Sequence, residues 1–274
     1  MPANMDSIRS IVVIGDYEDP LYHWFLSRLT HGANQNHYAV SSWCLDDPAF
    51  LDTDLSAPAA DLIINTTLEK SAFTLSAYLA SAKMEGHQQP SIIFQNVLCQ
   101  TLFEVQASSL KDCEQSNYDW LGFSAFSLYG HLDKTPPPAL ELCQIEANSM
   151  AEHQAFLESF NIPSTQSPAC PGLVLGRIVS MLVNEACFAL MENVATADAI
   201  DTAMTLGTNY PMGPLAWADK AGLDVILAIL NHLFAVYKEP RYRPARLLQE
   251  RVSLGLLGQK TGQGFYAYPE PAVI

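Results

Sequence analysis

Short apolar runs alternate with longer amphipathic stretches through the first 160 residues of the chain. Six runs have the length and composition of buried strands, and they cover 11–15, 38–43, 62–65, 91–94, 120–123 and 140–145. Helix-like stretches cover 21–30, 69–84, 99–109 and 149–160. Strands that alternate with helices predict a parallel sheet with helices on its faces, which is an α/β domain.

The pattern changes near Pro168, and only helical periods follow. We expect helices at 171–193, 196–207, 214–222, 223–238 and 244–253. Thr196 is placed as an N-cap, Pro214 as a first helical residue, and Gly207 and Gly222 as helix ends. The sequence therefore predicts an α/β domain over 1–168 and an all-α domain over 169–274.

Composition favours a cytoplasmic protein. The six cysteines are scattered without a C-x-x-C pair, which is typical of reduced, mostly buried thiols, and no His or Cys pairs have metal-ligand spacing. The chain starts without an apolar signal region, and no window has about 18 uninterrupted apolar residues. We therefore expect no metal and no membrane partner.

Charge is distributed unevenly. Residues 1–168 carry 6 Lys and Arg against 20 Asp and Glu, a net charge of −14, whereas residues 169–274 carry 8 against 9, a net charge of −1. Nucleic acid is excluded as a partner because phosphate backbones require a basic surface. The acidic first domain is also a poor match for dinucleotides or coenzyme A, which are polyanions.

The second domain carries a series of motifs in a fixed order. They read PGLVLGRIVSMLVNEACFALMENV, NYPMGPLAWADKAGLDVI, EPRYRP and LLGQKTGQGFYAY. This series resembles the helical C-terminal domain of the L-3-hydroxyacyl-CoA dehydrogenases. The resemblance implies a Rossmann-like first domain that binds NAD, a dehydrogenase activity on acyl-CoA substrates, and a homodimer formed through the helical domain.

The expected dinucleotide loop is degenerate. A Rossmann loop needs G-x-G-x-x-G, but the chain has Gly15-Asp16-Tyr17-Glu18-Asp19-Pro20, so Gly15 is the only cofactor-binding candidate. Its carboxylates lie where a phosphate would bind. The alternative is a capped turn that enters the first helix, with Tyr17 and Trp24 as side chains that could fill the crevice. The family's basic hairpin is replaced by the short acidic segment 45–60.

The catalytic positions that the resemblance implies are also changed. The family uses a histidine base in H-F-F-N-P, oriented by a glutamate in the next strand. We align these positions with Gly122 and Gln144. The serine of the family's N-T-S-S motif is replaced by Leu98 or Cys99 in the stretch that starts at Asn96. No catalytic residue is therefore expected to be intact.

Two residues are candidates for retained chemistry. Asn184, in the helix motif L-V-N-E-A, is the remnant site candidate; the alternative is an asparagine that satisfies a helix end or a partner subunit. His131 is the candidate for a relocated base, beside Asp133. The remaining six histidines have no carboxylate at a suggestive spacing.

Two functions remain open. The first is a homologue that has lost hydride transfer and acts as a binding or assembly subunit, with a homodimer, a protein partner or an acyl-CoA-like ligand and no cofactor. The second is an active NAD-dependent oxidoreductase of the fatty-acid β-oxidation type, with an altered substrate or a relocated base. The first is favoured because losses at the cofactor, substrate and base positions act together.

Overall fold

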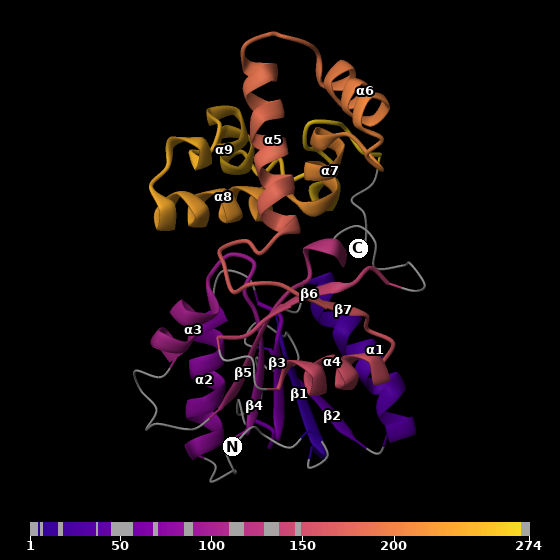
Figure 1. Ribbon diagram of the computed structural model, residues 1–274, viewed down its shortest axis with the longest axis vertical. Helices are drawn as coiled ribbons and strands as arrows, with labels where there is room; N and C mark the ends of the chain where they lie inside the picture. The colour runs from indigo at the N-terminus through magenta and orange to yellow at the C-terminus, as the bar shows by residue number, and fades with distance from the viewer. Residues whose placement is uncertain are drawn as a thin grey trace. The chain divides into compact units, whose positions relative to one another are not determined.

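The computed structural model describes residues 5, 8–15, 19–36, 38–44, 57–67, 71–84, 90–109, 118–128, 137–145 and 149–269. The chain divides into two compact units, Met1–Cys170 and Pro171–Ile274, and Figure 1 shows the sheet in the first and only helices and turns in the second. The boundary predicted after residue 168 lies two residues before this division.

The N-terminal unit contains a sheet in the order β2-β1-β3-β4-β5-β6-β7. The strands are β1 Ser10–Ile14, β2 Ala39–Trp43, β3 Leu62–Asn65, β4 Ile92–Asn96, β5 Asp119–Ser124, β6 Leu140–Cys143 and β7 Ser164–Gln166. The first five are parallel, β6 is antiparallel to β5, and β7 is parallel to β6. The six predicted strands are therefore confirmed, and β7 is an addition.

Four helices cover this sheet within the described ranges. They are α1 Pro20–Asn36, α2 Ser71–Met84, α3 Leu102–Ser109 and α4 Met150–Ser159. In Figure 1, α2 and α3 lie on one face and α1 and α4 on the other. On the second face, Ile11 and Val13 of β1 pack with Phe25 of α1 and Phe156 of α4. This apolar layer holds the carboxyl ends of the parallel strands in place.

The helical unit consists of α5 Leu175–Met191, α6 Ala197–Thr208, α7 Pro214–Ala221, α8 Leu223–Tyr237 and α9 Arg246–Ser253. Thr196 caps α6 as predicted, because its hydroxyl accepts a hydrogen bond from the Ala199 N–H at 3.3 Å. Pro214 begins α7 and Gly222 ends it. The predicted end of α6 at Gly207 is wrong: the helix continues to Thr208, and Asn209 adopts the left-handed conformation that ends it.

Across the described ranges, no single helix is long and apolar enough to cross a membrane; α7 and α8 satisfy that test only when taken together, and they meet at a bend of 99°. In the same described ranges, no group of three or more His, Cys, Asp or Glu side chains could hold a metal ion.

Candidate functional site

The carboxyl ends of β1 and β3 mark the point where the strand order reverses, and open α/β sheets bind ligands at such a point. Gly15 follows β1 directly. A Cβ atom at Gly15 would lie 2.3 Å from Cδ2 of Tyr22 and 2.7 Å from Oγ1 of Thr66. Tyr22 is only 2% exposed. The space beside the remaining loop glycine is therefore filled by an aromatic ring from α1.

Tyr22 was not among the side chains expected to fill this crevice. Trp24 packs edge-on against Phe25 at 5.0 Å between ring centroids, and the Arg28 guanidinium lies 4.8 Å from its ring. It therefore belongs to the packing of α1, while Tyr17 lies outside the described residues. A helical period from the end of the loop would have identified Tyr22, which follows Pro20 by two residues.

The start of α1 is capped by the chain itself. Oδ1 of Asp19 accepts a hydrogen bond from the Leu21 N–H at 2.9 Å, and its carbonyl accepts from Tyr22 N–H at 3.1 Å. A helix start attracts anions through these unpaired N–H groups and the helix dipole. Here a carboxylate takes that position, which supports the alternative of a capped turn. Asp16 and Glu18 lie outside the described residues.

Buried amides and hydroxyls follow at the ends of β3 and β4. The Asn65 amide donates to Gln95 Oε1 at 2.9 Å, and its Oδ1 accepts from the Thr67 hydroxyl at 2.8 Å. Asn96 donates to the Thr66 carbonyl at 3.0 Å and accepts from the Leu98 N–H at 3.2 Å. These polar side chains bond to one another and to nearby backbone groups, as buried polar groups must. The edge is polar, but its amides already have partners inside the chain.

The residues that face each other at this edge differ from those predicted. Ser124, the last residue of β5, is directly opposite Glu141 of the antiparallel strand β6. Opposed residues in an antiparallel pair point to the same face, and both are buried, with Glu141 8% exposed. The strand-end position and its acidic neighbour are therefore Ser124 and Glu141, and the alignment with Gly122 and Gln144 is wrong.

Gly122 lies inside β5, opposite Cys143. A Cβ atom there would lie 2.6 Å from the Cys143 sulfur and 3.2 Å from both Val97 methyl groups. The glycine is therefore explained by close packing between strands. Leu98 and Cys99 are buried, with exposed fractions of 0% and 8%.

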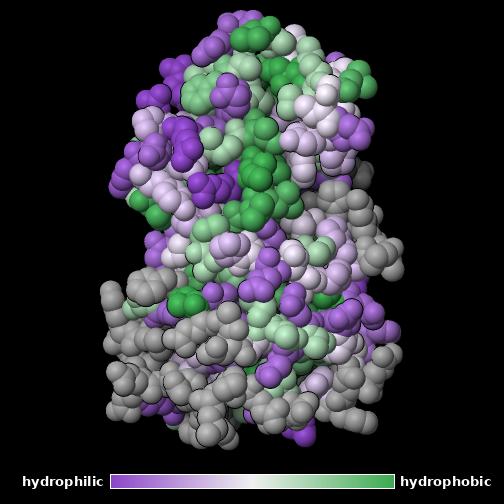
Figure 2. All heavy atoms as spheres, in the orientation of Figure 1, coloured by the Kyte–Doolittle hydropathy of each residue, from purple (hydrophilic) through white to green (hydrophobic). Residues whose placement is uncertain are grey.

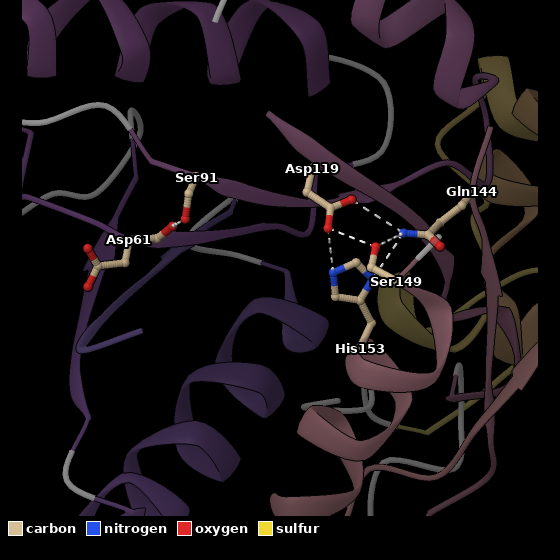
Figure 3. A network of polar contacts seen from close by, with 6 residues as sticks. All are labelled: Asp61, Ser91, Asp119, Gln144, Ser149 and His153. Atoms are coloured by element: carbon tan, nitrogen blue, oxygen red, sulfur yellow. Dashed lines mark hydrogen bonds and ion pairs between the residues drawn. The ribbon is translucent and has the colours of Figure 1, made fainter. Parts of the chain in front are cut away.

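Gln144 lies at the opposite end of β5, where Figure 3 shows it among Asp119, Ser149 and His153. Its Nε2 is 3.0 Å from the Ser149 hydroxyl, 3.0 Å from Nδ1 of His153 and 3.5 Å from Oδ1 of Asp119. Asp119 is the first residue of β5, so this network is at the amino edge of the parallel strands. Gln144 cannot orient a base at the carboxyl edge.

The same network includes a histidine that sequence spacing did not reveal. His153 is fully buried, and its Nε2 lies 3.2 Å from Oδ2 of Asp119. The Ser149 hydroxyl donates to the same carboxylate oxygen at 2.8 Å. Asp119 and His153 are 34 positions apart, so only the sheet brings them together. The network fixes the start of α4 to β5. His131, the other histidine candidate, lies outside the described residues.

Asn184 is held in the core of the helical unit. Its Nδ2 donates to the Arg243 carbonyl at 3.0 Å, and its Oδ1 accepts from the Ala245 N–H at 2.8 Å. Ala245 is the residue before α9. The amide therefore joins α5 to the start of α9, which supports the alternative that this asparagine satisfies a helix end.

Two buried carboxylates explain the closing motifs of the helical unit. Asp201 accepts from the N–H groups of Leu215 and Ala216 at the start of α7, both at 2.8 Å. Asp219 accepts from the N–H groups of Phe265 and Tyr266, both at 2.8 Å. Burial raises the pKa of Asp219, although these N–H groups oppose that shift. Sequence reasoning missed both roles because the partners are 14 to 47 positions away.

The first unit is a Rossmann-like sheet covered by helices, and the second is all-helical. The (S)-3-hydroxybutyryl-CoA dehydrogenase of Ralstonia eutropha matches over 96% of this chain and 100% of its own, with a TM-score of 0.72 and 24% identity. FadB2 of Mycobacterium tuberculosis matches with a TM-score of 0.71 and 19% identity over 95% of this chain and 99% of its own. At these identities the likeness defines the fold.

The sequence comparisons are more specific. Residues 172–268 match the family model of the 3-hydroxyacyl-CoA dehydrogenase C-terminal domain. A probable 3-hydroxybutyryl-CoA dehydrogenase of Bacillus subtilis is 37% identical over 141 residues, 49% of each chain. Its counterpart in Deinococcus radiodurans is 50% identical over 98 residues, 36% of this chain and 35% of the relative. The helical unit therefore matches the C-terminal domain of the 3-hydroxyacyl-CoA dehydrogenases, and the chain spans about half or less of the length of these relatives.

Proposed function

We propose that this chain is a 3-hydroxyacyl-CoA dehydrogenase homologue that no longer transfers hydride and serves as a binding or assembly subunit. The observation that carries the proposal is the packing beside Gly15: the Tyr22 ring lies against this glycine, and the Asp19 carboxylate accepts a hydrogen bond at the start of α1, where a Rossmann loop would bind a pyrophosphate. A phosphate about 4 Å from a carboxylate is repelled by roughly 1 kcal/mol in water and by more where solvent is excluded.

The strand ends support the same proposal. The family's reaction needs a base that accepts the proton of a substrate hydroxyl. The last residue of β5 is Ser124, and its hydroxyl oxygen accepts a hydrogen bond from the Phe126 N–H at 3.3 Å. A neutral serine hydroxyl is a very weak base, so the position that should remove the proton lacks a suitable group.

A second candidate function is an active oxidoreductase with an altered substrate or a relocated base. Glu141 favours it, because a buried carboxylate opposite Ser124 is a group that can accept a proton. The relatives from Bacillus subtilis and Deinococcus radiodurans bear the names of 3-hydroxybutyryl-CoA dehydrogenases. In that case NAD would be the cofactor.

Calorimetric titration with NADH, and separately with acetoacetyl-CoA, distinguishes the two. We expect no heat with NADH at millimolar concentration and no NADH absorbance when the protein is incubated with NAD and 3-hydroxybutyryl-CoA. Heat with the CoA ester alone supports a binding subunit. Micromolar NADH affinity together with NADH formation would overturn the proposal and establish the second candidate. The Bacillus subtilis relative serves as the positive control.

We further propose that the helical unit forms a homodimer. Figure 2 shows apolar residues gathered in a stripe along α5. Four apolar residues in and beside the two ends of α5 are exposed, namely Val174, Ile178, Met191 and Val194. Apolar surface of this kind is typical of a subunit contact. Sedimentation equilibrium should give twice the chain mass of 30.1 kDa. Ile178→Asp should give a monomer, whereas Leu254→Asp, on an exposed residue after α9, should not.

A further inference from the structure

A cluster of arginine and tyrosine side chains joins α5 to the turn after α8. The Arg177 guanidinium carbon lies 4.9 Å from the ring centroid of Tyr237 and 5.2 Å from that of Tyr242. Arg241 lies 4.8 Å from the Tyr242 ring. We call these four residues the guanidinium–tyrosine cluster. It places two cations around one buried ring, because Tyr242 is 2% exposed.

The cluster is cationic within an acidic chain. The segment 238–251 carries 5 Lys and Arg against 2 Asp and Glu, a net charge of +3, while the whole chain carries −15. Within the described parts of the chain, neither Arg177 nor Arg241 forms an ion pair with a carboxylate, whereas the neighbouring Arg246 pairs with Glu250 at 3.1 Å. Guanidinium groups that have no carboxylate partner favour an external anion.

The polar atoms of the cluster are arranged as donors. Nη1 of Arg177 donates to the Tyr237 hydroxyl at 3.3 Å, and Nη2 donates to the Tyr242 hydroxyl. A guanidinium has five N–H donors, so three remain on Arg177. Each tyrosine oxygen accepts from arginine, and among the described residues neither hydroxyl donates its own proton to an acceptor. A group of donors without a competing acceptor selects an anion.

We propose that the guanidinium–tyrosine cluster binds the phosphate group of a small phosphorylated ligand. A phosphate has several acceptor oxygens and up to two negative charges, and it matches the planar fork of arginine better than a point charge does. Arg177 is already held by two rings and two hydroxyls, so it loses little conformational freedom when the anion binds. The proposal does not depend on the proposed function, because this cluster lies in the helical unit.

The source of the phosphate is tested with two probes, inorganic phosphate and adenosine 3′,5′-bisphosphate, titrated into the full chain by calorimetry at low salt. Equal affinity for both indicates that the phosphate alone is recognised. Tighter binding of the nucleotide indicates additional contacts from its second phosphate or from its base, for which the 37% exposed Tyr237 ring is accessible. Both outcomes support the proposal. The proposal is overturned if neither probe gives heat when it is titrated to about 10 mM, a tenfold excess over the protein.

Three variants separate a specific site from general attraction. Arg177→Gln should weaken binding by about tenfold or more, because it removes a charge-assisted contact. Tyr237→Phe keeps the ring and removes one hydroxyl, and it should weaken binding by about threefold to tenfold. Arg246→Gln is the matched control, because this arginine is 78% exposed and already paired with Glu250; it should leave the affinity unchanged.

Equal losses in all three variants would mean non-specific attraction and would overturn the proposal. Circular dichroism verifies that each variant is folded. Tyr237→Phe keeps the packing of the cluster, whereas Arg177→Gln does not. Because NADH also carries phosphates, each variant is titrated with NADH as well. Weak NADH binding that disappears in Arg177→Gln belongs to this cluster, whereas NADH binding that persists belongs to the sheet edge and counts against the proposed function instead.

Discussion

The two units differ in what their buried polar side chains do. In the helical unit, Asp201 and Asp219 each accept several hydrogen bonds from distant backbone N–H groups and from tyrosine hydroxyls. In the N-terminal unit, the polar side chains at the carboxyl edge bond to one another, to backbone groups of adjacent strand ends, or to the helix start. The helical unit keeps its family motifs because those residues hold the fold together.

In the N-terminal unit, the sheet and the loop after β1 depend on different kinds of residue. A parallel sheet depends on many interchangeable apolar positions, and these remain in β1, β3 and β4, whose residues are nearly all buried. A dinucleotide site depends on a few glycines and one open helix start. Changes at those few positions would cost the sheet little, and here Tyr22 packs against Gly15 while Asp19 caps the start of α1.

The largest expected effect tests whether the helical unit depends on its buried carboxylates. Asp219→Ala leaves the N–H groups of Phe265 and Tyr266 and the Tyr268 hydroxyl without their acceptor. Unsatisfied buried donors cost about 1–3 kcal/mol each, and we expect a loss of about 3 kcal/mol or more in the free energy of unfolding. Urea denaturation followed by circular dichroism measures it.

The control for this substitution is Asp224→Ala. Asp224 forms an ion pair with Lys260, and both side chains are 36% exposed. Exposed ion pairs contribute about 0–1 kcal/mol, so this variant should remain close to the wild type. Equal losses from the two variants would mean that burial of Asp219 is not what distinguishes it, and the contrast between the units would be weakened.

A smaller effect is expected from the N-terminal unit. Gly122→Ala would place a methyl group 2.6 Å from the Cys143 sulfur in a buried strand pair. Overpacking of this kind costs about 1–3 kcal/mol. An alanine that is tolerated would mean that close packing does not require glycine at this position. Thermal unfolding of the variant measures the loss.

A second variant makes the result specific. Cys143→Ala removes the sulfur that the new methyl group would contact, so the double variant should lose less stability than the sum of the two single variants. Additive losses would show that the strain arises elsewhere in β5.

The sequence was sufficient for most of the sheet and for the order of the helices. The apolar runs of β1, β3 and β4 are unambiguous because these strands are buried on both faces. The strand β7 was missed because Ser164–Gln166 is three polar residues long and mostly exposed. Its place in the sheet comes from pairing with β6, which no local pattern records.

The site was harder to predict because it depends on register and on distant partners. A shift of two residues along β5 separates Gly122 from Ser124, and the corresponding shift along β6 separates Cys143 from Glu141. Only the antiparallel pairing shows which residues face each other at the sheet edge. The contact between Asp119 and His153 has the same origin, since it joins a strand start to a helix 34 positions later.

The smallest predicted effect has the opposite sign and belongs to the helical unit. Gly207 lies within α6, and a Cβ atom there would have no neighbour within 4 Å. Gly207→Ala should therefore stabilise the protein by about 0.5 kcal/mol, because alanine reduces the backbone freedom of the unfolded chain.

Gly222→Ala is the control: its φ of 100° is strained for alanine, and its Cβ would lie 2.8 Å from Oδ1 of Asp224. Calorimetric melting should show a small rise for the first variant and a fall for the second. A fall for both would contradict the prediction and would mean that a methyl group at position 207 is not accommodated.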